Sequence, residues 1–252
     1  MRTRVKICGV TTAADAAMIA RLGADAVGVV LAESKRRVDV ARAREIAGAL
    51  PPLVSLVGVF MDQALEVVRE TASAVPLDFV QLHGAEPAGD VAAMGRRVIK
   101  RLNVRADTTR EDLLRLASEY RDAAAILLDP GAGDGKTFDW SILLDRSRAT
   151  AESEPRAQAS GVTLEGQDAF ERSTLPRSRA LGVRMGAPDF KRRLIVSGGL
   201  TPTNVGDVVR LLRPMAVDVS SGVERSPRVK DEAKVRDFLQ AVRDADASFG
   251  DC

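Results

Sequence analysis

A cysteine and a lysine near the start of the chain are the first residues that could do acid–base chemistry. Cys8 ends the short apolar run Arg4–Cys8 and is followed by Gly9. A thiol has an ordinary pKa of about 8.5, and a nearby positive charge raises the fraction that is thiolate and can act as a base. Lys6, two residues earlier, points to the same side of a strand and could supply that charge. The alternative is a structural role, because cysteine is among the residues most often buried.

A carboxylate, Asp129, closes a second apolar run, Ala125–Asp129. The glycine-rich segment 130–135 follows it, and such a loop can move and close over a site. A partly desolvated aspartate has a raised pKa and remains a proton donor near neutral pH, which makes Asp129 a candidate general acid. Two alternatives remain open: that Asp129 only caps its own turn, and that Asp134, within the loop, is the carboxylate that acts.

A basic run and a single histidine are the remaining residues that could take part in binding or catalysis. At the rim of a site, a guanidinium of Ser34-Lys-Arg-Arg37 could hold a substrate carboxylate through two parallel hydrogen bonds; the plain alternative is a solvated turn. His83 is the only histidine in the sequence and ends the run Val80–His83. Since no carboxylate is evidently paired with it, we expect an orienting or structural role. No cluster of Cys, His and Asp has metal-ligand spacing, so no metal is implied.

Two late segments, Val196–Gly199 and Asp218–Glu224, suggest a phosphate site. In α/β barrels, the Gly- and Ser-rich tips of late strands present backbone N–H groups to a phosphate. A thiol at one strand tip and a phosphate cradle at two others argue for an enzyme that acts on a phosphorylated small molecule.

Eight short runs rich in Val, Ile and Leu alternate with amphipathic stretches such as Asp39–Leu50 and Gln63–Ala72. Most strands begin about 20 to 30 residues after the previous one, which predicts a single (β/α)8 barrel, a TIM barrel of the α/β class. An open doubly wound sheet is the alternative, and the lack of Gly-x-Gly-x-x-Gly after the first strand disfavours it. The expected strands are Arg4–Cys8, Ala24–Leu31, Val54–Phe60, Leu77–His83, Arg97–Leu102, Ala124–Asp129, Arg193–Ser197 and Ala216–Ser220.

The interval between the sixth and seventh expected strands is about forty residues longer than one strand–helix unit needs. The surplus, residues 146–189, is rich in Ser, Ala, Arg, Glu and Gly and has weak periodicity. We therefore expect a polar, flexible or loosely packed insertion within a single domain of residues 1–252. It falls in a helix-to-strand connection, which places it on the barrel face opposite the site.

The composition limits the classes of function. A chain of 252 residues that is 45% hydrophobic and only 4% aromatic suits one aliphatic core around buried parallel strands. The formal net charge of +2 favours neither nucleic-acid nor membrane binding, and no apolar run of about 18 residues or signal peptide is recognisable. Two cysteines, Cys8 and Cys252, make no disulfide framework, so we expect a cytoplasmic protein. We also expect a monomer, with a homodimer as the alternative.

Six segments occur in one order, and together they closely resemble the N-(5'-phosphoribosyl)anthranilate isomerase family of tryptophan biosynthesis. The resemblance covers nearly the whole chain except residues 146–189. The segments are Lys6-Ile-Cys-Gly9, Val57-Gly-Val-Phe60, Val80-Gln-Leu-His-Gly84, Gly135-Lys-Thr-Phe-Asp-Trp140, Ser197-Gly-Gly-Leu200 and Val217-Asp-Val-Ser-Ser-Gly-Val-Glu224.

This resemblance implies an Amadori rearrangement that needs neither a metal nor a cofactor. The substrate N-(5'-phosphoribosyl)anthranilate becomes 1-(2-carboxyphenylamino)-1-deoxyribulose 5-phosphate. In the family, the cysteine of the first segment is the general base and the aspartate that closes the sixth strand is the general acid, which implies these roles for Cys8 and Asp129.

The resemblance also implies the residues that bind the substrate. The family's arginine after the second strand holds the anthranilate carboxylate, which corresponds to Arg36. Asp218 is expected to contact the substrate from the eighth strand. The phosphate is expected at the two late strand tips, on Gly199, Ser220, Ser221 and Gly222.

The chain departs from the family pattern in two places: the loop 130–135 is several residues shorter, and Arg228 stands where a glycine is usual. Other phosphate-binding barrels are alternatives. Indole-glycerol-phosphate synthase would need a lysine-centred site, and ribulose-phosphate epimerase would need metal-binding histidines that this chain lacks. A non-catalytic scaffold, with the insertion as a docking segment, is disfavoured by the joint presence of Cys8, Arg36 and Asp129.

Overall fold

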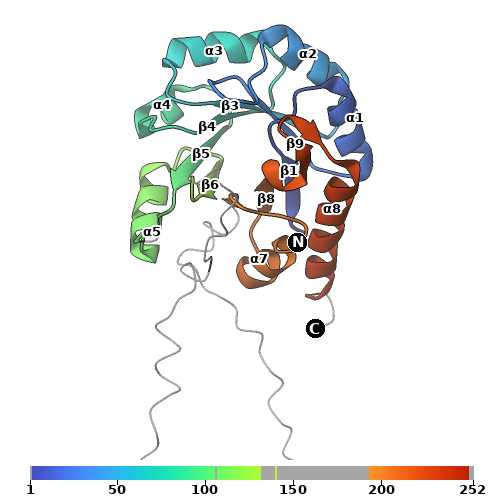
Figure 1. Ribbon diagram of the computed structural model, residues 1–252. Coiled ribbons are helices and arrows are strands. Elements are labelled where there is room, and N and C mark those ends of the chain that lie inside the picture. Colours follow the sequence, from blue (N-terminus) through green and yellow to red (C-terminus); the bar gives the residue numbers. More distant parts are fainter. Residues whose placement is uncertain (1, 106, 132–139, 141–192, 250–252) are drawn as a thin grey trace, which may run out of the picture.

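Eight parallel strands close into a barrel, and the helices lie around its outside (Figure 1). The computed structural model describes residues 2–105, 107–131, 140 and 193–249. Neighbouring strands pair in sequence order, and β8 pairs with β1 to close the barrel. The strands are β1 (Arg4–Ile7), β2 (Ala26–Val30), β3 (Ser55–Phe60), β4 (Phe79–Leu82), β5 (Val98–Asn103), β6 (Ala125–Asp129), β7 (Leu194–Val196) and β8 (Ala216–Val219).

Several helices begin at caps that the sequence encodes. The side chains of Thr12, Asp39 and Asp231 each accept a hydrogen bond from the backbone N–H three residues later. Thr109 and Asp112 form a reciprocal capping box. The helices are α1 (Ala13–Leu22), α2 (Val40–Gly48), α3 (Leu65–Ala74), α4 (Ala88–Ala93), α5 (Arg110–Glu119), α7 (Val205–Leu212) and α8 (Glu232–Ala247). After β8, the 3-10 turn η3 (Ser221–Val223) leads into a hairpin of β9 (Glu224–Ser226) and β10 (Val229–Lys230).

The strand side chains alternate between the inside of the barrel and the layer beneath the helices. Inside, a small apolar cluster that includes Val57, Ile99 and Leu127 fills the barrel. The outward side chains pack against the helices in a larger cluster. Toward the carboxyl ends of the strands, buried inward positions become polar, as at Lys6 and Asp218. The inward-facing side chains at the carboxyl ends of the strands therefore place polar groups at one mouth of the barrel.

The predicted (β/α)8 barrel is confirmed, although some strand bounds differ. The second and fourth strands begin two residues later than expected, at Ala26 and Phe79. Cys8, His83 and Ser220, expected as the last residues of strands, lie just beyond β1, β4 and β8.

The predicted insertion at 146–189 and Asp134 lie outside the described residues. Arg228, where the sequence analysis expected a departure from the family pattern, has a φ of 74°, in the left-handed region that glycine adopts most easily.

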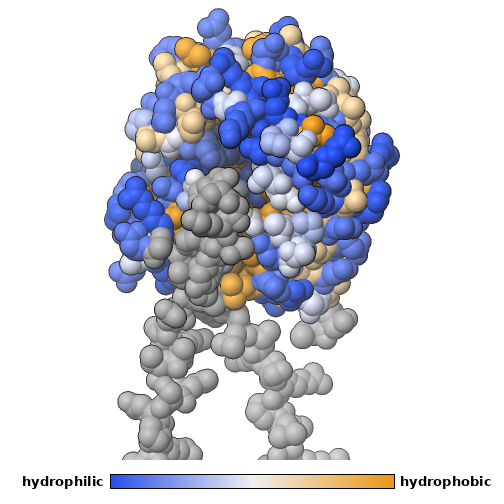
Figure 2. Space-filling view, in the orientation of Figure 1, coloured by the Kyte–Doolittle hydropathy of each residue, from blue (hydrophilic) through white to orange (hydrophobic). Residues whose placement is uncertain are grey.

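The apolar character of the described part can be judged from its helices and its surface. In residues 2–105, 107–131, 140 and 193–249, no helix is both long and apolar enough to cross a bilayer. The face seen in Figure 2 is mostly hydrophilic, with scattered apolar residues. Among the described residues, the large apolar side chains that are exposed are Leu53, Met61 and Val67.

A buried ion pair fixes the loop that follows β4. Lys100 Nζ lies 2.6 Å from Glu86 Oε2 and donates to the Gly84 carbonyl at 2.7 Å, and the two charged side chains are only 2% and 5% exposed. Glu86 Oε1 accepts the N–H groups of Asp62 and Gly84. Burial alone would raise the pKa of Glu86, but the hydrogen bond from Lys100 and those from the backbone outweigh it and lower the pKa. This loop begins beside His83, so the pair also supports the mouth of the barrel.

We expect Lys100→Met to destabilise the protein by about 3–5 kcal/mol, because it leaves the Glu86 carboxylate buried without its cation. Urea unfolding at pH 7 measures this loss. The lowered pKa of Glu86 means that its contribution is complete above the unfolded value of about 4.3 and is lost as the pH falls through the folded value. The difference between wild type and variant should therefore narrow below about pH 4.

The control is Arg115→Met, which removes an exposed pair with Glu119 on α5 and should change the stability little. Equal losses in the two variants would contradict the importance of the buried pair.

Candidate active site

A cavity of about 520 Å³ opens at the carboxyl ends of the strands. Its volume is typical of sites for small molecules. Every site residue predicted from the sequence lines it, namely Cys8, Arg36, Asp129, Gly199, Asp218, Ser220, Ser221 and Gly222. His83 and Ser34 also line the cavity. The structure therefore brings together side chains from six different strand ends or their loops.

Cys8 lies just past β1, where its backbone N–H donates to the Val219 carbonyl at 2.8 Å. Its thiol occupies space that Gly28, on the neighbouring β2, leaves free. A Cβ on Gly28 would lie 2.9 Å from the Cys8 sulfur and 3.1 Å from Lys6 Nζ. A side chain at position 28 would therefore displace both the thiol and the ammonium beside it.

The net effect on the thiol differs from the expectation. Lys6 lowers the pKa of Cys8 as predicted, but burial has the larger effect, and the Asp218 carboxylate also opposes Lys6. The pKa of the Cys8 thiol is therefore raised overall, although Lys6 lowers it as the sequence predicted.

Lys6 and Asp218 form an ion pair beneath the cavity. Lys6 Nζ lies 2.9 Å from Asp218 Oδ1, with the side chains 4% and 6% exposed. Burial alone would lower the pKa of Lys6, but the charge of Asp218, its hydrogen bond and the smaller contribution of Cys8 together outweigh burial and raise the pKa. Ser197 Oγ donates to the second carboxylate oxygen at 3.3 Å. Asp218 lines the cavity as expected, yet its oxygens already hold Lys6 and Ser197.

Asp129 is oriented by its own turn and faces His83. Its Oδ1 accepts the Gly131 N–H at 2.8 Å, and its Oδ2 lies 4.0 Å from His83 Nε2. The expectation that His83 has no carboxylate partner is therefore wrong. Burial lowers the pKa of His83, and the nearby charge of Arg101 lowers it further, so the imidazole is neutral at neutral pH. Gln81 Nε2 lies 2.9 Å from His83 Nδ1, and with this amide as donor the imidazole proton is on Nε2, facing Asp129.

Arg101, on β5, is a cation of the cavity that the sequence analysis missed. Its Nη2 donates to Asn103 Oδ1 at 3.0 Å and to the Asp129 carbonyl at 3.4 Å. A Cβ on Gly131, whose φ is 75°, would lie 2.5 Å from the same nitrogen. Arg101 therefore lies directly under the turn that carries Asp129. The only sequence signal was a polar pair at alternate positions, Arg101 and Asn103, near the end of a strand.

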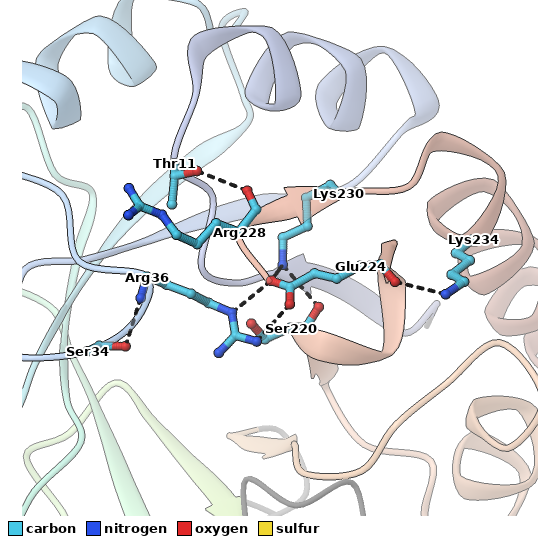
Figure 3. A network of polar contacts seen from close by, with 8 residues as sticks. All are labelled: Thr11, Ser34, Arg36, Ser220, Glu224, Arg228, Lys230 and Lys234. Atoms are coloured by element: carbon cyan, nitrogen blue, oxygen red, sulfur yellow. Dashed lines mark hydrogen bonds and ion pairs between the residues drawn. The ribbon is translucent and has the colours of Figure 1, made fainter. Parts of the chain in front are cut away.

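Arg36 belongs to a network of charges beside the cavity (Figure 3). Its Nε and Nη2 both lie 2.7 Å from the Glu224 carboxylate oxygens. Glu224 also holds Lys230 at 3.1 Å, and Lys230 donates to the Ser220 carbonyl at 3.0 Å. Gly9 leaves room for Arg36, because a Cβ there would overlap the arginine Cδ. The sequence analysis placed Arg36 at the site but missed its partner Glu224 and the second cation on that carboxylate, Lys230.

The late strand tips pack closely enough to require glycine. Gly198 and Gly199 have φ values of 88° and 64°, and a Cβ on Gly222 would collide with the Leu200 carbonyl. Asn204 Nδ2 donates to the Gly199 carbonyl at 2.9 Å and fixes the first tip. The second tip, η3, begins a helical turn whose first N–H groups have no acceptor within the turn. The two tips line the cavity on the side of β7 and β8.

No group of three or more His, Cys, Asp or Glu side chains that could hold a metal ion occurs in the described ranges of the chain. The cavity is built from ion pairs and hydrogen bonds between protein groups.

Comparison with known proteins identifies the family. The family model for N-(5'phosphoribosyl)anthranilate (PRA) isomerase matches residues 5–161 and 182–241. The N-(5'-phosphoribosyl)anthranilate isomerase of Pseudomonas aeruginosa (strain LESB58) is 39% identical over 247 residues, 95% of each chain. The chain belongs to the N-(5'-phosphoribosyl)anthranilate isomerase family.

Other members of the N-(5'-phosphoribosyl)anthranilate isomerase family agree. The isomerase of Dechloromonas aromatica (strain RCB) is 35% identical over 254 residues, 99% of this chain and all of the relative. The crystal structure of phosphoribosyl anthranilate isomerase from Thermotoga maritima has a TM-score of 0.72 at 35% identity and covers 96% of this chain and 99% of its own. Another crystal structure of the family, in complex with reduced 1-(o-carboxyphenylamino)-1-deoxyribulose 5-phosphate, has a TM-score of 0.70 at 34% identity, with the same coverage.

The family predicted from six sequence segments is thereby confirmed, and the chain is an isomerase of tryptophan biosynthesis. Indole-glycerol-phosphate synthase and ribulose-phosphate epimerase are accordingly excluded as its family.

The raised pKa of Cys8 can be measured by alkylation. In a Cys252→Ser background, Cys8 is the only cysteine left. We expect its reaction with iodoacetamide to rise with pH around a midpoint above the ordinary thiol value of about 8.5. Lys6→Met should move the midpoint higher still, because the charge of Lys6 lowers the pKa. A midpoint below that of a cysteine peptide would mean that the field of Lys6 outweighs burial.

Proposed function

We propose that this chain converts N-(5'-phosphoribosyl)anthranilate into 1-(2-carboxyphenylamino)-1-deoxyribulose 5-phosphate, with Asp129 as general acid and Cys8 as general base. The observation that carries the proposal is that these two side chains line one cavity from the separate strands β1 and β6. An acid and a base on different walls can act on different faces of a bound sugar. Membership of the isomerase family is the basis for proposing this reaction, and the cavity contains a carboxyl group and a thiol that could act as its acid and base.

Ring opening is the first step. Asp129 gives a proton to the furanose ring oxygen, and the ring opens to an iminium ion. Because Oδ1 accepts the Gly131 N–H, the transferable proton is on Oδ2, the oxygen nearest His83. The carboxylate that forms is then stabilised by the Nε2–H of the neutral imidazole. Gln81 fixes this imidazole through Nδ1, so His83 is already oriented before the step.

Removal of the C2' proton is the second step. The iminium carbon next to it makes this proton acidic enough for a thiolate to take. The Cys8 thiolate forms beside the ammonium of Lys6, which stabilises the negative charge. The enolamine then tautomerises to the ketone. One sugar carbon is oxidised as its neighbour is reduced, so the reaction balances without an external oxidant or cofactor.

The two anionic ends of the substrate bind to different groups of the cavity wall. Arg36 has one edge of its guanidinium on Glu224, and its other edge, at Nη1 and Nη2, receives the anthranilate carboxylate. Gly199, Ser220, Ser221 and Gly222 hold the phosphate through backbone N–H groups and hydroxyls. Asp218 contacts the substrate from β8. The solved family structure in complex with a reduced, phosphorylated ligand supports a small phosphorylated molecule as the ligand.

The direct test generates phosphoribosylanthranilate in situ from anthranilate and phosphoribosyl pyrophosphate and follows the loss of its fluorescence. Purified protein should accelerate the loss and form the carboxyphenylamino ketose. A protein that binds the reduced product analogue without turnover would instead be a non-catalytic member of the family.

Cys8→Ala should lower kcat about 10²-fold or more and leave KM nearly unchanged, because it removes the base without touching the groups that bind the two anions. Steady-state kinetics in the fluorescence assay measure both parameters. Cys252→Ala is the matched control and should retain the wild-type kcat. A Cys8→Ala enzyme with most of its activity would make Cys8 a structural cysteine.

Asp129→Asn should be at least as damaging to kcat, because ring opening needs a proton that an amide cannot donate. Circular dichroism and binding of the reduced product analogue establish that the variant still folds and recognises the ligand. Asp134→Asn distinguishes the two carboxylates of this loop. Wild-type turnover in Asp129→Asn together with its loss in Asp134→Asn would assign the acid to Asp134.

A further inference from the structure

The carboxylate of Glu224 connects the loop after β2 with the turn after β8. From β9 it holds both donors of one edge of Arg36 at 2.7 Å, and it accepts Lys230 at 3.1 Å (Figure 3). Lys230 continues to the Ser220 carbonyl at 3.0 Å. Arg36 and Ser220 both line the cavity. One acidic side chain therefore connects, through two cations, two separate parts of the cavity wall.

The network is buried on the protein side and open on the cavity side. The side chains of Lys230 and Glu224 are 0% and 5% exposed, whereas that of Arg36 is 24% exposed. A guanidinium held through Nε and Nη2 has its plane and direction fixed, because both hydrogen bonds must stay in that plane. Its Nη1 edge is the part left for a ligand.

The network also has a rigid support. Lys234 Nζ donates to the Glu224 carbonyl at 2.8 Å, and Thr11 Oγ1 donates to the Arg228 carbonyl at 3.0 Å (Figure 3). These bonds attach the β9–β10 hairpin to α8 and to the loop after β1. Burial alone would raise the pKa of Glu224, but the hydrogen bond from Arg36 and the charge of Lys230 lower it. The carboxylate is therefore ionised at neutral pH.

We infer that Glu224 is a positioning residue that fixes Arg36 relative to the turn at Ser220, and so sets the separation between carboxylate and phosphate in the ligands that the cavity accepts. This inference rests on the proposed function, in which Arg36 receives the carboxylate and the Ser220 turn the phosphate. Glu224 itself does not reach the ligand, since it does not line the cavity in the described part of the chain.

Charge and position give opposite expectations for Glu224→Gln. The two cations and one carboxylate have a net charge of +1, and the amide would raise it to +2, which on charge alone would tighten the binding of any anion. A glutamine side chain has only one oxygen that can accept a hydrogen bond from Arg36. Its NH₂ group would face an N–H donor of Arg36 or Lys230, with which it cannot form a hydrogen bond. If Glu224 acts by position, binding of the carboxylate must weaken despite the added positive charge.

The test is calorimetric binding at pH 7 of three probes: reduced 1-(o-carboxyphenylamino)-1-deoxyribulose 5-phosphate, the same compound without its ring carboxylate, and inorganic phosphate. Glu224→Gln should weaken the first probe about tenfold or more, whereas the other two, which have no ring carboxylate for Arg36 to hold, should bind as tightly as to wild type or tighter. Glu224→Asp keeps every charge but shortens the side chain by one methylene, and it should show the same selective loss. Unchanged or tighter binding of the first probe to either folded variant would overturn the inference.

Two further variants separate this inference from the proposed function. Arg36→Ala should abolish the preference for the carboxylated probe; if it does not, the proposed role of Arg36 fails. If Arg36→Ala abolishes the preference for the carboxylated probe but Glu224→Gln and Glu224→Asp keep it, only the inference about Glu224 fails. Glu45→Gln, which removes an exposed pair with Arg42 on α2, should bind all three probes as wild type does. If Glu224→Gln does not fold, Glu224→Asp decides the question alone.

Discussion

The barrel closes between its first and last strands across a buried ion pair. Lys6 and Asp218 are register partners on β1 and β8, and their charged atoms lie 2.9 Å apart. Removing two such charges from water costs several kcal/mol for each, and only close pairing with additional hydrogen bonds offsets it. Ser197 supplies one of these bonds from β7, so three adjacent strands meet at the pair. Cys8 lies two residues beyond Lys6, just past the end of β1, and both members of the pair at the seam contribute to the electrostatic surroundings of the thiol.

The alternation of strand side chains explains why apolar and polar layers succeed each other in the barrel. The amino-terminal half of the interior is filled by aliphatic side chains such as Ile99 and Leu127. Two residues further along the same strands the inward positions are Arg101 and Asp129, which face the cavity. Glycines at Gly28 and Gly131 make room for the functional groups of the neighbouring strands. The site is thus a continuation of the core, built on rigid strands and completed by loops.

Most of the fold and the centre of the site could be predicted from the sequence. Strand tips that end in Cys8 or Asp129 are local features, and period-two burial with regular spacing predicts the barrel. What could not be predicted depends on contacts between distant residues. Glu224 is 188 residues from Arg36 along the chain, and no sequence motif near either residue predicts that they pair. The partnership of His83 with Asp129, and the dominance of burial over Lys6 at Cys8, likewise exist only after the strands have closed.

A base with a raised pKa suits the proposed chemistry better than the sequence alone would suggest. A lone lysine beside Cys8 would produce more thiolate, but the nucleophilicity and basicity of a thiolate fall as its pKa falls. Burial has the largest effect and raises the pKa of Cys8, and Asp218 offsets part of the field of Lys6. The thiolate is consequently scarcer and more basic. Scarcity is tolerable in the proposed mechanism because the iminium ion formed by Asp129 acidifies the C2' proton before Cys8 acts. The acid step thus lowers the demand on the base, so a thiolate that burial keeps scarce is sufficient to remove the proton.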